Sequence, residues 1–296
     1  MAFPTLGAVV REQAGVPWSR AKKLCIDGRV TVDGERCTDP AARVSPGAVV
    51  VVNESAPRQR AGALAPESIV FFDRDLVVVD KPAGMLSVAD EPGNKDTLGS
   101  HVRTLLRRKG GGDAALAVVH RLDRDTSGVM VFARAASAQR ALAVQFRDHT
   151  VERAYLAIVH GAVASARIES DLVPDRGDGL RGSFGHFRRA RGAPPPEARH
   201  AVTHVEAIAA LRDATIVECR LETGRQHQIR IHLSELGHPL VGEPVYIRDY
   251  EGRKIASPRP MLHARTLGFT HPRTGQRVAF EREPPADFRT MLEMLR

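Results

Sequence analysis

The stretch "LAVVHRLDRDTSGVMVFAR", residues 116–134, constrains the fold most, because it places a dense group of charges between two apolar runs. "LAVVH" and "GVMVFAR" each have the length and composition of a buried strand. If these runs are neighbouring strands of the core, residues 121–127 form a loop at one edge of a sheet. A charged loop anchored on both sides by buried strands is a suitable platform for a functional site.

The same residues also fit a solvated turn. In that reading Asp125, Thr126 and Ser127 bond their own backbone, and Gly128 allows the chain to reverse. From this segment alone the solvated turn is the favoured interpretation, so the choice depends on other parts of the chain.

A second charged segment, "TGRQHQIRIHLSELG", favours the functional reading. It predicts a helix that ends at Gly237, and Thr223 and Gln226 have the spacing of a capping box. Arg230 lies off the apolar face of this helix, and we expect it to point toward a pocket beside the sheet. An arginine near an aspartate favours the ionised form of the aspartate. An ionised carboxylate can act as a nucleophile or stabilise a cationic sugar. The apolar face consists of Ile229, Leu233 and Leu236.

The chain from residue 69 onward predicts many strands and a few helices. Glycine and proline close the segment "DKPAG", residues 80–84, which we read as a turn framing the cleft, with RNA contact by Lys81 as the alternative. "SAQRALAVQFRDH" predicts a helix with Ser137 as a possible cap. The arginine- and glycine-rich residues 174–199 predict a mobile basic loop. Because no glycine-rich phosphate loop is present, we expect an α+β fold with a mixed, mainly antiparallel sheet and flanking helices.

The N-terminal part predicts a separate small α+β domain over residues 1–54, joined by a polar linker at 55–68 to a larger domain at 69–296. In "SRAKKLCIDGRVTVDGERC" a helix starts at Ser19 and stops at Gly28, and a strand and a tight turn follow. Ala21, Leu24 and Cys25 would form its apolar face, with Arg20, Lys23 and Asp27 pointing elsewhere. We expect Arg20, Lys22 and Lys23 to meet a phosphate backbone.

Composition narrows the class of partner. The chain of 296 residues has 43 Lys and Arg against 35 Asp and Glu, a net charge of +8, which suits a polyanion without proving one. Three cysteines without paired spacing favour a reducing compartment. No apolar run approaches the roughly 18 residues needed to span a bilayer. We therefore expect a cytoplasmic, soluble monomer with no membrane partner.

The twelve histidines raise the possibility of a metal site. His227 and His232, however, would stand about 140° apart around a helix, which makes a poor chelating pair. We expect no metal.

The segments "SRAKKLCIDGRVTVDGE" and "RVSPGAVV" resemble the small RNA-binding domain first described in the fourth ribosomal protein of the small subunit. The resemblance covers about 50 residues. The alternative is a solvated helix face on an unrelated accessory domain.

Four segments, in order, resemble the motifs of the pseudouridine synthases that modify large-subunit ribosomal RNA and some transfer RNA. They are "VVVDKPAGMLSV", "HRLDRDTSGVMVFAR", "RAYLAIVHG" and "TGRQHQIRIHLSELGHPLVG". The resemblance implies isomerisation of uridine to pseudouridine in structured RNA, with no cofactor and no metal. Ribosomal RNA is the favoured substrate because of the N-terminal domain, and transfer RNA is the alternative.

The resemblance also implies roles for single residues. Asp123 corresponds to the catalytic aspartate, Tyr155 to the active-site tyrosine and Arg230 to the basic partner of the aspartate, whereas Asp125 falls on a variable position and receives a loop role. The reaction detaches the base, rotates it and rejoins it through carbon five. A carboxylate can start it by attacking the anomeric carbon or by taking a sugar proton, and both routes stay open. A tyrosine stacked on the base can relay the proton that leaves carbon five.

Reaching a base in folded RNA requires flipping it from its stack. Arg121 or Arg124 can fill the gap or hold flanking phosphates, and we also expect RNA contacts from Arg225 and His227. The chain departs from the family in "VGEPVYIRDYEG", where Glu243 replaces the usual aspartate and Ile247 follows Tyr246. Two other classes remain as alternatives: a non-catalytic RNA-binding or ribosome-assembly factor, and a nucleoside glycosidase.

Overall fold

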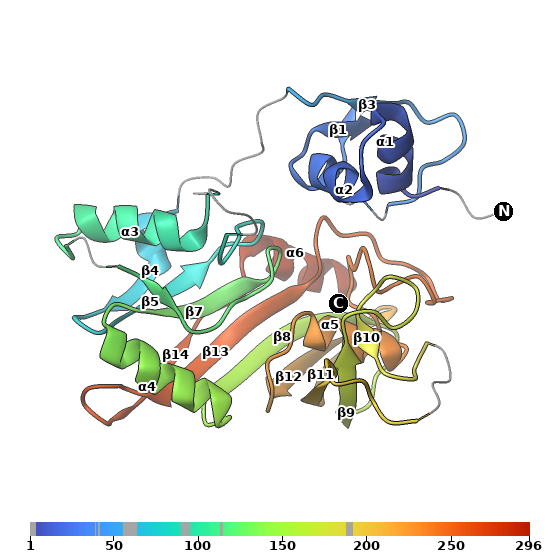
Figure 1. Ribbon diagram of the computed structural model, residues 1–296. Helices are drawn as coiled ribbons and strands as arrows, with labels where there is room; N and C mark the ends of the chain where they lie inside the picture. Colours follow the sequence, from blue (N-terminus) through green and yellow to red (C-terminus); the bar gives the residue numbers. More distant parts are fainter. Residues whose placement is uncertain are drawn as a thin grey trace. The chain divides into compact units, whose positions relative to one another are not determined.

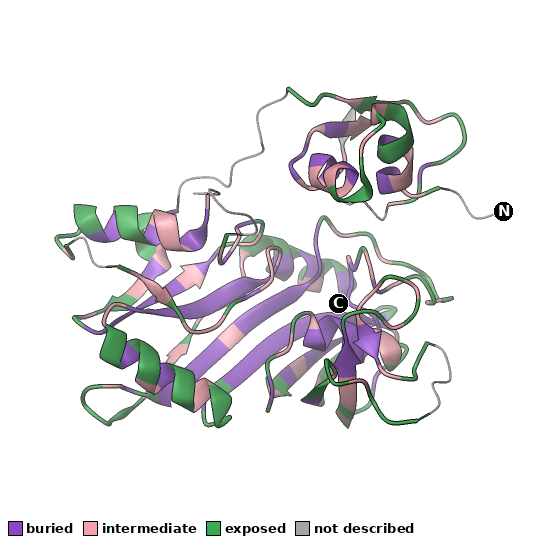
Figure 2. Ribbon diagram, viewed as in Figure 1, coloured by how far each residue is buried: buried purple, intermediate pink, exposed green. Residues whose placement is uncertain are grey.

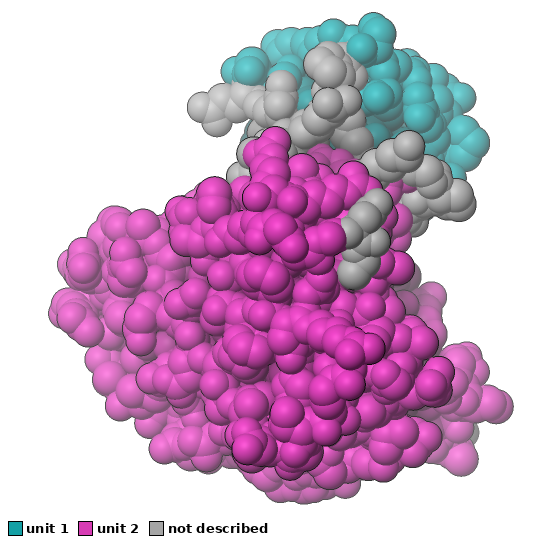
Figure 3. Space-filling model, turned by 90° about the vertical axis from the view of Figure 1, so that its left-hand side faces the viewer, with its two compact units in different colours: residues 1–62 teal, residues 63–296 magenta. Residues whose placement is uncertain are grey.

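The chain folds into two compact units, residues 1–62 and 63–296 (Figure 3). The computed structural model describes residues 4–38, 40, 42–55, 64–89, 94, 96–112, 115–187 and 192–296. Each unit has an apolar core of its own. Among the described residues, no helix has the length and apolar character needed to cross a membrane.

The first unit combines two helices with a three-stranded antiparallel sheet in the order β2-β1-β3. Its elements are α1 (Leu6–Ala14), α2 (Trp18–Ile26), β1 (Val30–Val32), β2 (Glu35–Arg36) and β3 (Val50–Val52). Ala21, Leu24 and Cys25 are fully buried on α2, which confirms the predicted apolar face. Asp27 was expected to point away from the core but is only 3% exposed, because it follows α2 as its C-cap. Helix α1 was not predicted.

The second unit is built on an eleven-stranded sheet within the part of the chain that the structure describes (Figure 1). The strand order is β10-β9-β11-β12-β8-β13-β7-β5-β4, with β14 paired to β13 and β6 paired to β7. All of these pairs are antiparallel except β13 with β7, which are parallel. The predicted α+β class with a mixed, mainly antiparallel sheet is therefore confirmed.

The bounds of the strands follow the apolar runs closely. They are β4 (Ile69–Phe72), β5 (Leu76–Lys81), β6 (Ala117–Val118), β7 (Ser127–Ala133), β8 (Glu152–His160), β9 (Ala166–Val173), β10 (Gly182–Ser183), β11 (Arg199–Leu211), β12 (Ala214–Leu221), β13 (Leu262–Thr270) and β14 (Arg277–Glu281). The central strands are almost wholly buried (Figure 2).

Four α-helices, with a short 3-10 turn η1 (Pro66–Ser68), complete the described part of this unit. They are α3 (Leu98–Arg108), α4 (Ala136–Arg147), α5 (Gln228–Glu235) and α6 (Ala286–Leu295). Ala138 and Leu142 of α4 pack into a core with residues of β5, β7 and β13. Phe288, Met291 and Leu295 of α6 pack into another core with residues of β8 and β12. These two cores hold the sheet that carries the site.

Three local predictions about helix starts and strand length were wrong. Ser137 lies inside α4, which has no side-chain cap. Helix α5 has no capping box, because the hydroxyl of Thr223 donates to Gln228 Oε1 instead. The predicted strand "LAVVH" pairs only at Ala117 and Val118, since the imidazole of His120 accepts the backbone N–H of Val131 where a strand carbonyl would otherwise stand.

The predicted mobile loop at 174–199 is ordered over much of its length. Asp175 accepts backbone N–H groups of Gly177 and Gly179, and β10 pairs with the end of β9. The side chain of Arg176 is only 4% exposed and pairs with Asp178. Polar contacts supply the order that the apolar content could not. Residues 188–191 of the predicted loop lie outside the described residues.

Candidate active site

The charged loop at 121–127 emerges where β7 meets its parallel neighbour β13. Ser127 and Gly128 pair with His263 and Ala264 at this point. Gly128 has a φ of +117°, and a Cβ there would lie 2.1 Å from the carbonyl oxygen of Ala264. Only glycine fits this close approach, so the direction in which the loop leaves the sheet is fixed by the sequence.

Lys81 supports the loop from inside the protein. Its Nζ donates to the carbonyls of Pro82, Arg124 and Thr126 at 3.0, 2.7 and 2.7 Å, one for each ammonium proton. Burial lowers the pKa of Lys81 to about 7, against the opposing charges of Asp125 and Asp123. The side chain is fully buried, so the alternative that Lys81 contacts RNA is wrong.

Two further contacts fix the loop backbone. The hydroxyl of Ser87 donates to the carbonyl of Leu122 and accepts its N–H, at 2.6 and 3.1 Å. Arg259 donates from Nη1 to the carbonyl of Asp125 at 3.1 Å. A loop held from both ends in this way presents Asp123 in a defined position.

Asp123 faces two groups from the α5 region. Its Oδ2 lies 3.7 Å from Nη1 of Arg230, and its Oδ1 lies 3.9 Å from Nε2 of His227. The carboxylate keeps 20% of its surface exposed, whereas the Arg230 side chain keeps 10%. The predicted pairing of Asp123 with Arg230 is therefore present in the geometry.

Glu243 holds Arg230 in place. Its two carboxylate oxygens accept from Nε and Nη2 of Arg230 at 2.8 and 2.6 Å, and its side chain is fully buried. Burial would lower the pKa of Arg230, but the hydrogen bond and charge of Glu243 raise it above the ordinary value. Glu243 Oε1 also accepts the backbone N–H groups of Val245 and Tyr246. The residue that departs from the family pattern thus orients the basic partner of Asp123.

Tyr155 reaches the same place from β8, where it pairs with Ala264 of β13. It is 8% exposed, and burial raises its pKa, with Arg153 opposing and Asp123 adding to that effect. Asp123, Tyr155 and Arg230 line one cavity of about 60 Å³. We call it the catalytic cavity, after the role that the sequence predicts for these three residues. Its remaining lining residues are Arg121, Leu122, Thr126, Leu221, Arg225, His227, Gln228, Ile229 and Leu262.

Tyr246 completes the site and was not predicted. Its hydroxyl lies 2.7 Å from Nδ1 of His227, and the guanidinium of Arg230 lies 5.3 Å from its ring centre. Burial lowers the pKa of His227, which favours the neutral imidazole. His232 instead contacts Ser170 and Thr203, so the two histidines serve different networks. The one signal for Tyr246 in the sequence was its position three residues after Glu243, in the segment "VGEPVYIRDYEG".

The residues predicted to contact RNA fall in two places. Arg121 and Arg225 line the catalytic cavity, and Arg124 donates from Nε to the carbonyl of Gly84 at 3.1 Å. On α2, Arg20 pairs with Glu54, and Lys22 and Lys23 are half-buried. No RNA is present, so their contacts with RNA stay predictions.

Trp18, at the start of α2, is an exposed aromatic residue that the sequence reading did not single out. The side chain is 40% exposed. Nζ of Lys22 lies 5.3 Å from its ring centre, and the guanidinium of Arg11 lies 6.0 Å from it. An aromatic face flanked by cations is a surface on which a nucleic-acid base can stack.

Comparison with known families gives two matches. Residues 75–235 match the RNA pseudouridylate synthase family, and residues 9–50 match the S4 domain. Ribosomal large subunit pseudouridine synthase D of Zymomonas mobilis is 38% identical over 291 residues, which cover 93% of this chain and 88% of the relative. An uncharacterized RNA pseudouridine synthase of Bacillus subtilis, YlyB, is 34% identical over 94% of this chain and 90% of its own length.

Solved structures agree on the fold. The human RNA pseudouridylate synthase domain containing 4 superposes with a TM-score of 0.61 at 23% identity, over 77% of this chain and 92% of that one. The human RNA pseudouridylate synthase domain containing 1 gives a TM-score of 0.59 at 26% identity, over 77% of this chain and 87% of that one.

Proposed function

The chain belongs to the RNA pseudouridylate synthase family and carries an S4 domain at its N-terminus, and from this premise we propose that it converts uridine to pseudouridine in ribosomal RNA through Asp123. As a pseudouridine synthase it is an isomerase. The observation that carries the assignment of Asp123 is its place in the catalytic cavity, 3.7 Å from Arg230, on a loop that buried groups pin to the sheet.

Asp123 starts the reaction in this proposal. Attack on the anomeric carbon and removal of a sugar proton both require an ionised carboxylate, and Arg230 supplies positive charge beside it. Glu243 keeps Arg230 from closing fully onto Asp123, because two of the guanidinium nitrogens are already bonded to it. The carboxylate stays available to the substrate while its charge is compensated.

Tyr155 handles the proton that leaves carbon five in the second half of the reaction. Because burial raises its pKa, the phenol stays protonated at neutral pH. It acts as a relay, giving up its own proton as it accepts another, and not as a free phenolate. Its place in the same cavity as Asp123 supports this role.

Ribosomal RNA is the proposed substrate, with transfer RNA as the alternative. Several relatives at 36–39% identity are named ribosomal large subunit pseudouridine synthase D, which supports the ribosomal choice. The net charge of +8 suits an RNA partner. The proposal places RNA binding in residues 1–54, a linker at 55–68 and catalysis in 69–296, in a cytoplasmic monomer that needs no cofactor.

Mapping pseudouridines in cellular RNA tests the proposal. RNA from cells with and without the protein would be compared, and the deficient cells would be complemented with the wild-type chain or with Asp123→Asn. We expect one or a few pseudouridines of large-subunit ribosomal RNA to disappear and to return only with the wild type. If pseudouridines disappear from transfer RNA alone, transfer RNA is the substrate instead of ribosomal RNA. Restoration by Asp123→Asn would instead favour a non-catalytic RNA-binding factor.

A further inference from the structure

A second pocket, of about 220 Å³, adjoins the catalytic cavity and carries three arginines, Arg181, Arg199 and Arg225. We call it the arginine pocket. It lies at the end of β9 and the start of β11, beside the segment that leads into α5. Arg225 lines both spaces, so the two are neighbours at this residue.

The three guanidinium groups have no carboxylate partner among the described residues, in contrast to Arg176, Arg220 and Arg230 of the same unit. Arg199 donates to the carbonyls of Pro196 and Ala198, and to no other group of the described residues. Glu197 belongs to the wall as well, yet no ion pair joins it to these arginines in the described part of the chain. Three uncompensated positive charges around one pocket favour an anion there.

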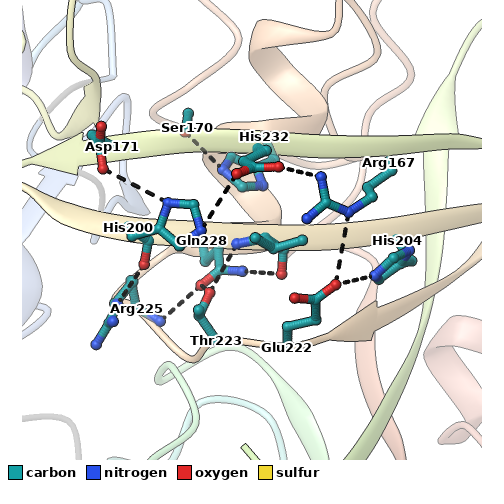
Figure 4. A network of polar contacts seen from close by, with 12 residues as sticks. Arg167, Ser170, Asp171, His200, His204, Glu222, Thr223, Arg225, Gln228 and His232 are labelled. Carbon is teal, nitrogen blue, oxygen red and sulfur yellow. Dashed lines mark hydrogen bonds and ion pairs between the residues drawn. The ribbon is translucent and has the colours of Figure 1, made fainter.

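Arg225 is oriented for a role in both spaces. Its backbone N–H donates to Gln228 Oε1 at 3.0 Å, and its Nε donates to the carbonyl of His200 at 2.9 Å (Figure 4). Within the part of the chain that the structure describes, its two Nη atoms make no hydrogen bond. These two nitrogens can donate to two oxygens of one phosphate, in a bidentate contact.

Arg181 couples the arginine pocket to the catalytic cavity through its charge. Burial is the main cause that lowers the pKa of His227, and Arg181 lowers it further. Burial raises the pKa of Tyr246, and Arg181 opposes that effect. The positive charge of Arg181 therefore acts on His227, which lies 3.9 Å from Asp123, and on Tyr246, which contacts His227.

The pocket also has an apolar wall. Leu172, Val173 and Ile231 line it and are 6%, 4% and 1% exposed. An apolar wall combined with guanidinium groups suits an unpaired nucleotide, whose base meets the apolar side and whose phosphate meets the arginines. A free inorganic anion would leave the apolar side unused.

We propose that the arginine pocket binds the base and phosphate of a nucleotide adjoining the target uridine, and that Arg225 spans the two nucleotides. The inference rests on the proposed function, since it takes RNA as the substrate. A flipped uridine leaves its neighbours unstacked, and a fixed site for one neighbour keeps the strand in register with Asp123. Binding energy gained there positions the uridine for reaction.

Kinetics of Arg199→Gln in the complete chain test the proposal. The substrate is a stem-loop RNA that carries the uridine mapped in cellular RNA. We expect the KM to rise about tenfold, a smaller change in kcat, and a salt dependence of log KM weaker by about one unit of slope. Arg140→Gln is the matched control, because Arg140 is exposed on α4, outside both pockets. Its kinetics should match the wild type.

Neutral methylphosphonate linkages then locate the phosphate. RNAs with one neutral linkage at each position around the target uridine are assayed with the wild type and with Arg199→Gln. At one position the neutral linkage should raise the wild-type KM about tenfold and leave the KM of the variant unchanged. The same position should be found with Arg181→Gln.

Two outcomes overturn the proposal while leaving the proposed function standing. One is a wild type that isomerises the RNA while Arg199→Gln and Arg181→Gln behave like Arg140→Gln. The other is a KM increase that is the same in wild type and variants at every neutral linkage, which would indicate a diffuse electrostatic effect. A wild type that isomerises no RNA would refute the proposed function itself.

Discussion

Arg230 in the catalytic cavity and Arg199 in the arginine pocket are treated in opposite ways by the protein. Arg230 is buried, with both carboxylate oxygens of Glu243 bonded to it and Asp123 nearby. Arg199 is exposed, and among the described residues its hydrogen bonds go to neighbouring carbonyls alone. Under the proposed function, the charge beside the reacting atoms is paired within the protein, whereas the charges of the arginine pocket are left for RNA to pair.

The catalytic side of this comparison makes the largest prediction. Asp123→Asn removes the carboxylate and should lower the rate of pseudouridine formation at least about a thousandfold, the scale of losing a catalytic nucleophile. Single-turnover assays with excess enzyme give the rate directly. Asp125→Asn is the control, since Asp125 contributes its backbone carbonyl to Arg259, and it should retain activity. Equal losses in both variants would show that the loop, and not Asp123, sets the rate.

Tyr155→Phe should lower kcat by about a hundredfold to a thousandfold, because loss of a positioned proton relay costs in that range. The ring remains, so the KM for RNA should change little. If the hydroxyl serves the second half of the reaction, base detachment precedes the block. Rapid-quench analysis should therefore detect RNA in which the base is detached or rejoined without proton loss. A variant with wild-type kcat would remove Tyr155 from the reaction.

Glu243→Gln tests whether Arg230 depends on its carboxylate partner. The variant loses the carboxylate that bonds two nitrogens of the buried Arg230, at a cost of about 3 kcal/mol in the free energy of unfolding. Because Arg230 is then less well placed beside Asp123, we also expect a roughly tenfold to hundredfold loss in kcat. Urea unfolding and single-turnover kinetics measure the two effects. Glu243→Asp keeps the charge and should restore much of both.

The exposed pair of Arg253 and Asp213 is the matched comparison for Glu243. The two side chains lie 3.2 Å apart and are 80% and 50% exposed. Asp213→Asn should therefore cost under about 1 kcal/mol. Equal costs for Glu243→Gln and Asp213→Asn would contradict the view that Arg230 depends on its partner.

Lys81 predicts a pH dependence of stability. Its pKa is lowered by burial from 10.5 to about 7, so between these values the unfolded chain binds more protons than the folded one. Stability contributed through Lys81 therefore rises as the pH goes from about 7 toward 10.5. The unfolding free energy of the wild type relative to that of Lys81→Met should rise by about 3 kcal/mol from pH 6.5 to pH 9.5. A difference that does not change with pH would show that Lys81 does not titrate in this range in the folded protein.

The N-terminal unit carries the smallest predicted effect. Trp18→Ala should weaken RNA binding about fivefold, since one stacked base contributes on the order of 1 kcal/mol or more. Trp18→Phe keeps an aromatic face and should retain most of the affinity. Fluorescence anisotropy at several salt concentrations measures both variants, and binding should weaken as salt rises. An alanine variant with wild-type affinity would mean that RNA avoids this face.

The sequence predicts the fold class because its apolar runs have strand length and strand period. "GVMVFAR" and "AYLAIVHG" became β7 and β8 in the buried centre of the sheet. The sequence-based predictions were wrong where a side chain takes the place of a backbone hydrogen-bond partner. His120 shortened a predicted strand, and Thr223 bonded Gln228 instead of capping a helix. Such contacts arise from tertiary packing, which local patterns do not contain.

The sequence predicted the residues that line the catalytic cavity, but not the residues that hold them in place. Asp123, Tyr155 and Arg230 were named from the order of motifs, and the structure brings them to one cavity. The burial of Lys81 depends on a loop 43 residues further along the chain, which only the folded sheet brings to it. Glu243 stands 13 residues after Arg230, beyond the end of α5, so the helical pattern did not reveal their contact. The arginine pocket has the same origin, since β9, β11 and the segment before α5 meet there.

Single-turnover rates over a range of RNA concentrations, for Asp123→Asn and Arg199→Gln side by side, test the division between chemistry and recognition most directly. Asp123→Asn should stay inactive at saturating RNA, because binding cannot replace the missing carboxylate. Arg199→Gln should recover most of the wild-type rate once RNA is saturating. Recovery of Asp123→Asn at high RNA concentration would contradict the central assignment.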